Sequence, residues 1–217
     1  MLFFIAFLPA INADANIDTT EKNALLYYEY INDQELLITF QLSEVIQEQI
    51  MTPAGLFTKL DVPSLGFIGD IGSPQLPALT RMYAVPTHDL SLTILAADLR
   101  QTRDVGRLLP VQNPQTDSGI GGNLEFVYDE DAYQQDVTYP DPLAEIVELG
   151  KIRDIPFVTI RFYPIQYNPA RRIAMFYDSI QIKLMFSTPQ PVFVESDYEQ
   201  KPFYAYYETM FQNWQGF

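Results

Sequence analysis

Residues 72–86 read Gly72-Ser73-Pro74-Gln75-Leu76-Pro77-Ala78-Leu79-Thr80-Arg81-Met82-Tyr83-Ala84-Val85-Pro86. The first part of this stretch is rich in glycine and proline, which favour turns over regular structure. The second part is mostly apolar, and its aromatic and β-branched residues favour strands. We therefore predict a Gly/Pro turn that leads into a strand from Leu79 to Val85.

A second informative segment lies further along the chain and reads Tyr163-Pro164-Ile165-Gln166-Tyr167-Asn168-Pro169. Before it, Val158, Ile160 and Phe162 alternate with residues that face the other way. After it, the same alternation returns at Ile180, Ile182, Leu184 and Phe186. Alternation with a period of two residues is typical of a half-buried strand. The segment is therefore predicted to be a strand, an Asn-Pro turn and a long return strand.

The rest of the chain follows the same pattern. Further strands are predicted at residues 25–31, 36–42, 56–60, 90–99 and 144–149, with Gly150 turning the chain. Residues 43–50 fit either a strand or a helical turn, and residues 61–75 and 107–125 are predicted loops. Between residues 198 and 214 the period changes to that of a helix with one apolar face: Phe203, Tyr206, Tyr207, Met210, Phe211 and Trp214. The predicted fold class is all-β, an antiparallel β-sandwich with a C-terminal helix.

The composition limits the function classes. The 217 residues are 47% hydrophobic and include 14 Tyr and 15 Phe, enough for a sizeable core. A net charge of −15 argues against nucleic acid and against an anionic membrane surface as partners. The chain has no cysteine, so disulfides, thiolate zinc sites and a cysteine nucleophile are excluded. No metal site and no cofactor are predicted.

The N-terminus favours export. Residues 2–10 are almost wholly apolar, and Ala13 and Ala15 are the small residues that a signal peptidase reads. We predict a signal peptide at residues 1–15 and a mature domain at residues 16–217, secreted or at the cell surface, with no membrane span in the mature form. The alternative is an apolar N-terminal strand, and the region lacks the usual Lys or Arg before the apolar run.

From Leu36 onward, the order of these pieces resembles the N-terminal propeptide domain of gingipain-type cysteine peptidases. The first shared element is Gly-x-Pro-x-Leu-Pro, at residues 72–77. A loop-rich middle ends in a Tyr-x-Glu-Asp piece at residues 128–131, and a Pro-x-Gln-Tyr-Asn-Pro turn follows at residues 164–169. The resemblance covers most of the mature chain. It implies a propeptide-like domain that is not itself an enzyme.

The resemblance also implies a partner: the catalytic domain of a gingipain-type cysteine peptidase, in cis or in trans, which the domain would keep latent and help to fold. In the family, a basic residue on a loop enters the specificity pocket, where a guanidinium can form bidentate bonds with acidic groups. Matching Asn113-Pro114 to the family places that position near Pro110, and Arg107 is the nearest basic residue. Arg107 is therefore the candidate inhibitory residue, with Leu108, Leu109 and Pro110 as candidate partner contacts. The alternative is a solvated loop arginine.

Other constellations point less clearly to a function. His88 is the only histidine and sits in a predicted turn, without the Gly-x-Ser-x-Gly motif of a hydrolase. The acidic run Asp129-Glu130-Asp131 lacks the glycine of a calcium-binding EF-hand loop. The many aromatic residues leave one rival open, an exported adhesion or carbohydrate-binding β module that stacks sugars on exposed rings.

Overall fold

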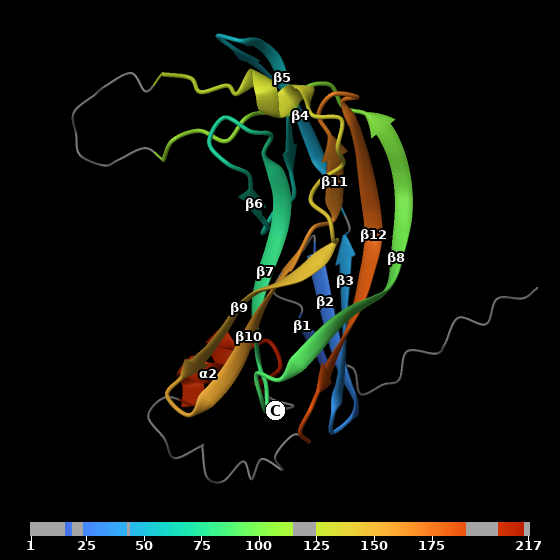
Figure 1. Cartoon of the computed structure of the whole chain (residues 1–217), viewed down its shortest axis with the longest axis vertical. Coiled ribbons are helices and arrows are strands. Elements are labelled where there is room, and N and C mark those ends of the chain that lie inside the picture. Colours follow the sequence, from blue (N-terminus) through green and yellow to red (C-terminus); the bar gives the residue numbers. More distant parts are fainter. Residues whose placement is uncertain (1–15, 19–23, 43, 115–124, 190–203, 215–217) are drawn as a thin grey trace, which may run out of the picture.

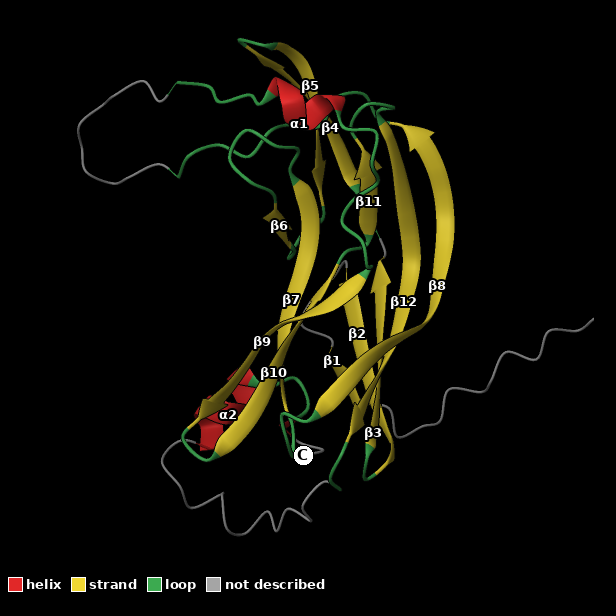
Figure 2. Ribbon diagram, in the orientation of Figure 1, coloured by secondary structure: helices red, strands yellow, loops and turns green. Residues whose placement is uncertain are grey.

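The structure is a computed structural model that describes residues 16–18, 24–42, 44–114, 125–189 and 204–214. These residues form two antiparallel sheets, a separate hairpin and two short helices (Figures 1 and 2). The strands are β1 (Asn16–Asp18), β2 (Ala24–Asn32), β3 (Glu35–Leu42), β4 (Ile46–Thr52), β5 (Gly55–Asp61), β6 (Gly66–Ile68), β7 (Leu76–Ala84), β8 (Leu90–Asp104), β9 (Ala144–Ile152), β10 (Ile155–Phe162), β11 (Ile165–Asn168) and β12 (Ile173–Phe186). The helices are α1 (Glu130–Gln134) and α2 (Tyr204–Met210). The predicted fold class is confirmed.

One sheet is organised around β12, which lies between β8 on one edge and β3 and β11 on the other. β12 pairs with β8 along its whole length, and on its other edge it pairs with β3 and then with β11. β2 and β1 extend this six-stranded sheet beyond β3. The second sheet has four strands in the order β6-β7-β10-β9, and β4 pairs only with β5. All of these strand pairs are antiparallel.

The main core lies between the two sheets and comes from the predicted alternation. On β3, Ile38 and Phe40 are fully buried, as are Ile160 and Phe162 on β10. The rings of Phe40 and Phe162 stack across the core with centroids 5.7 Å apart. Burial of such apolar side chains is the main free-energy term that holds two sheets together. The alternating pattern of the sequence therefore decides which face of each sheet points inward.

One predicted turn is wrong. Gly150 does not turn the chain: it lies inside β9, which continues to Ile152, and the turn follows at Arg153, whose φ is +58°. A Cβ at position 150 would lie 2.3 Å from Cζ of Phe157, its pairing partner on β10. The glycine is needed because an aromatic ring crosses the strand there. From the sequence alone, such a glycine cannot be distinguished from one that makes a turn.

Three other boundaries differ from the predictions. Residues 46–52 form a strand whose side chains are mostly exposed, so no alternation marks it. The predicted loop at residues 61–75 contains the short strand β6. The predicted C-terminal helix is seen at Tyr204–Met210, and the earlier part of that prediction, including Phe203, lies outside the described residues. Tyr207, Phe211 and Trp214 from its apolar face are buried.

The two helices lie at opposite ends of the molecule (Figure 2). Near one end, α2 and the residues after it pack on β10 through Tyr207, Phe211 and Phe157. At the other end, α1 lies beside the β4–β5 hairpin (Figure 2). The predicted loop with Arg107 belongs to this second end. Among the described residues, no helix is both long and apolar enough to cross a membrane.

Candidate functional site

The candidate loop, residues 105–111, follows the end of β8 and is fixed along one side by Thr58 of β5. The backbone N–H of Thr58 donates to the carbonyl of Arg107 (2.7 Å), and the N–H of Leu109 donates to the carbonyl of Thr58 (2.7 Å). The Thr58 hydroxyl donates to the carbonyl of Val105 (2.6 Å) and accepts from the Gln49 side chain (2.8 Å). One buried threonine thus satisfies three backbone groups of the loop, as buried polar groups require.

The other side of the loop is held by the Gly/Pro turn at the start of residues 72–86. The N–H of Gln75 donates to the carbonyl of Leu109 (2.8 Å), and the N–H of Val111 donates to the carbonyl of Ser73 (2.9 Å). The N–H of Gly72 donates in turn to the carbonyl of Val111 (2.8 Å). The loop therefore lies between two segments of backbone, like an irregular strand of a small sheet.

The second informative segment, residues 163–169, also contacts this loop. The buried Tyr167 on β11 donates its hydroxyl to the carbonyl of Gly106 (2.7 Å), where the backbone has a φ of +72°. Burial raises the pKa of Tyr167 to about 12 because its phenolate would lose hydration. Gln166 is buried beside it and donates to the carbonyl of Pro140 (2.6 Å). Two of the motifs that carry the family resemblance, residues 72–77 and 164–169, thus support the same loop.

Helix α1 closes this end of the fold. Asp129 caps its N-terminus, accepting bonds from the N–H groups of Asp131 (3.0 Å) and Ala132 (3.2 Å). Tyr133 on α1 points inward and donates its hydroxyl to the carbonyl of Leu108. Burial raises the pKa of Tyr133 well above its usual range. The acidic run at residues 129–131 therefore begins a helix whose Tyr133 is bonded to the candidate loop.

The structure places the four predicted site residues in different surroundings. Leu108 is fully buried and Pro110 is buried, so in this conformation they support the loop and offer a partner no surface. Arg107 and Leu109 are half-buried. The Arg107 guanidinium lies 4.5 Å from the centre of the Phe57 ring and donates to the carbonyl of Ala54 (3.2 Å). The role of this loop in partner binding stays a prediction, now centred on Arg107 and Leu109.

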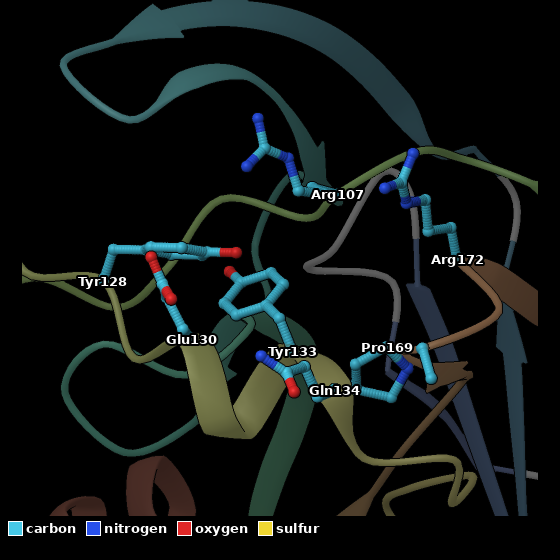
Figure 3. Close-up of a pocket in the computed structure, with 8 residues that line it drawn as sticks. Arg107, Tyr128, Glu130, Tyr133, Gln134, Pro169 and Arg172 are labelled. Atoms are coloured by element: carbon cyan, nitrogen blue, oxygen red, sulfur yellow. The ribbon is translucent and has the colours of Figure 1, made fainter.

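Arg107 also lines an open hollow of about 530 Å³, together with Tyr128, Glu130 and Tyr133. Arg172, from the turn between β11 and β12, lines the opposite side. We call this site the two-arginine hollow. Figure 3 shows the Arg172 side chain to the right of Arg107, with the Tyr133 ring below Arg107 and beside Tyr128. Sequence reasoning missed Arg172, because it is distant from Arg107 in the chain and no motif includes it.

The other sequence candidates do not form a catalytic or metal site. His88 makes a 2.7 Å hydrogen bond with the carbonyl of Gly150, which joins the turn before β8 to strand β9. No group of three His, Cys, Asp or Glu residues that could hold a metal ion occurs in the described part of the chain. Among the same residues, the strongly exposed aromatic side chains are Phe67 on β6 and Tyr206 on α2. They lie on separate elements, and most other described rings contribute to the cores.

Comparison with known proteins places this geometry in a family. The Propeptide_C25 family matches residues 22–211. Lys-gingipain of Porphyromonas gingivalis is 24% identical over 179 residues, which is 80% of this chain and 10% of the relative. Gingipain R1 of the same organism is 21% identical over 160 residues, which is 70% of this chain and 15% of the relative. The chain thus spans about a tenth of the length of the Lys-gingipains that it matches.

Two solved structures have the same fold. The first is a complex of Porphyromonas gingivalis RgpB pro- and mature domains, in which the matched chain is 17% identical with a TM-score of 0.73. The match covers 88% of this chain and 97% of that chain. The second concerns zymogenic latency of gingipain K from the same organism, at 21% identity and a TM-score of 0.66, covering 78% of this chain and 95% of that chain.

Proposed function

The chain belongs to the Propeptide_C25 family, and we propose from this that it inhibits a gingipain-type cysteine peptidase, keeps it latent and assists its folding. One observation carries the proposal. The fold matches 97% of a chain in a complex of pro- and mature domains, so the likeness extends over a whole domain. The chain itself has no cysteine, so any cysteine nucleophile must lie on the partner. Export through a signal peptide at residues 1–15 is part of the same proposal.

The candidate loop is the proposed contact with the peptidase. Its backbone is bonded on both sides, by Thr58 and by residues 72–75, so the loop is held before a partner arrives. A segment that is already ordered loses little conformational entropy on binding, which is what an inhibitor that must resist turnover requires. Arg107 is the proposed inhibitory residue, and its guanidinium would bond to acidic groups of the partner. The acidic surface of the domain would favour docking to a more basic enzyme.

The test starts with the DNA that follows the codon for Phe217, where we expect a gingipain-type peptidase domain in frame or adjacent. This domain is then produced with and without the chain. We expect a higher yield of folded peptidase when the chain is present, and a fall in peptide hydrolysis when the purified chain is added. A folded peptidase whose activity is unchanged by excess chain would contradict the inhibitory role. Unchanged inhibition by Arg107→Ala would remove Arg107 from it.

A further inference from the structure

The two-arginine hollow concentrates positive charge in a strongly acidic protein. The chain carries a net charge of −15, yet Arg107 and Arg172 line one hollow. Neither guanidinium forms an ion pair with any residue that the structure describes, whereas Arg171, adjacent in the chain, pairs with Asp136 at 2.7 Å. In a protein with more than twice as many carboxylates as cations, two cations that lack an acidic partner among the described residues suggest a site for an external anion.

The hollow is held in shape before any ligand binds. Arg107 rests on the Phe57 ring at 4.5 Å and donates to the carbonyl of Ala54, which fixes the plane of its guanidinium. Arg172 has a φ of +60°, and its N–H donates to the carbonyl of Pro169 (3.3 Å) in the tight turn that presents its side chain. Tyr133 lines the hollow below Arg107 (Figure 3). Cationic groups that are already positioned bind an anion at a lower entropic cost.

Among the residues that the structure describes, one acidic side chain lines the hollow. Glu130 lies on α1 beside Tyr128 and is exposed, and it makes no ion pair with either arginine. Two guanidinium groups and one carboxylate leave the site with one net positive charge. A guanidinium pairs in a bidentate way with a planar carboxylate. The volume of about 530 Å³ is larger than one carboxylate needs, so the site has room for several residues of a peptide chain.

We propose that the two-arginine hollow binds an acidic loop of the peptidase, with Arg107 and Arg172 bonding Asp or Glu carboxylates of that loop. This inference rests on the proposed function, since it names the partner's chemistry at the candidate site. It differs from a role in which Arg107 leaves its place to enter a pocket of the enzyme. Here Arg107 keeps its contacts with Phe57 and Ala54, and the partner supplies the group that enters.

Three variants test the hollow. Arg172→Gln removes one cation from an exposed turn, and we expect the peptidase complex to dissociate about tenfold more readily, as for the loss of one charge-assisted bond. Glu130→Gln removes the opposing carboxylate and should tighten the complex by about threefold. The matched control is Arg171→Gln, which changes the net charge equally but lies outside the hollow and should leave affinity within about twofold. Equal weakening by the Arg171 and Arg172 variants would overturn the proposal.

A second measurement needs no peptidase. The chain is titrated with the blocked peptide Ac-Asp-Glu-Asp-Glu-NH₂, its amide counterpart Ac-Asn-Gln-Asn-Gln-NH₂, and inorganic phosphate, while the Nε–H signals of Arg107 and Arg172 are followed by NMR. We expect saturable shifts with the acidic peptide alone, weakened by Arg172→Gln and by added salt. Equal binding of the amide peptide, or binding of phosphate without preference for the peptide, would overturn a carboxylate site.

The two measurements separate failure of the inference from failure of the proposed function. If the chain inhibits the peptidase but Arg172→Gln and Glu130→Gln leave the complex unchanged, the domain is an inhibitor and the hollow is not its contact. If the acidic peptide binds at the hollow but the peptidase is not inhibited, the carboxylate site stands and its assigned partner is wrong. Arg172 is the better probe than Arg107, because Arg107 also supports the β4–β5 hairpin.

Discussion

The space between the sheets and the end with the candidate loop are stabilised in different ways. Between the sheets, apolar side chains such as Ile160, Phe162 and Ile182 are fully buried at every second position. At the loop end, Thr58 and Tyr167 instead bond to backbone carbonyls that no regular strand satisfies. Hydrophobic contacts tolerate changes of similar volume, but each polar contact depends on one donor and one acceptor. The sandwich therefore sets global stability, and the polar contacts set the shape of the loop.

The largest effect should come from the core between the sheets. Phe162→Ala removes a fully buried ring that stacks on Phe40. We expect the free energy of unfolding to fall by about 4 kcal/mol, because the cavity cannot collapse between two sheets. Urea denaturation followed by circular dichroism measures this, and both ends of the fold should unfold in the same transition. A loss below about 1 kcal/mol would mean that the sheets repack around the gap.

A smaller and more local effect is expected at the loop end. Thr58→Val keeps the side-chain shape but removes the hydroxyl that bonds to Val105 and Gln49. We expect a loss of about 1–2 kcal/mol, because a buried carbonyl is left without its donor. Hydrogen exchange of the Leu109 N–H, which bonds to the Thr58 carbonyl, should become faster while exchange in β3 does not change.

The same substitution on a strand provides the control for this comparison. Thr159 on β10 is 8% exposed, and its hydroxyl has no hydrogen-bond partner among the described residues. Thr159→Val should therefore leave stability unchanged or raise it by up to about 1 kcal/mol. If Thr159→Val destabilised the domain as much as Thr58→Val, the hydroxyl at position 58 would have no special role in the loop.

The same contrast explains what the sequence can predict. The alternation at residues 36–42, 158–162 and 180–186 indicated the strands and their buried faces, because a period of two residues is visible in the chain itself. The bond between Tyr167 and Gly106 depends on how distant segments meet, and so does the position of Arg107 and Arg172 at one hollow. Contacts between distant segments leave no periodic pattern in the sequence. The motifs at residues 72–77 and 164–169 marked the site only through a family resemblance, and they proved to hold the loop from two sides.

Alkaline pH should weaken the loop end through its buried tyrosines. Burial raises the pKa of Tyr167 to about 12 and also raises the pKa values of Tyr133 and Tyr139, all at this end. A folded-state pKa above the ordinary value of 10.0 means that the folded protein holds its proton longer. The associated stability is complete below pH 10 and is lost as the pH rises through 12.

We therefore expect urea midpoints to fall between pH 10 and pH 12, together with a rise in tyrosinate absorbance. Tyr167→Phe should be less stable than the unmodified chain at pH 8, because the bond to Gly106 is lost, and its midpoint should depend less on pH. An unchanged pH dependence in this variant would assign the alkaline loss to other groups.

The smallest effect is expected from an exposed polar contact at the same end. Arg171 bonds to Asp136 at 2.7 Å and, with Asn168, lowers the pKa of that carboxyl below its ordinary value of 3.8. Stability from a lowered pKa is present above pH 3.8 and is lost as the pH falls through the folded-state pKa. Because both side chains of the pair are exposed, Asp136→Asn should lower the melting temperature only slightly at pH 7 and not at all in strong acid. Arg171→Gln should give the same small change. A large loss from either variant would mean that exposed ion pairs, and not the buried hydroxyls, hold the loop end in place.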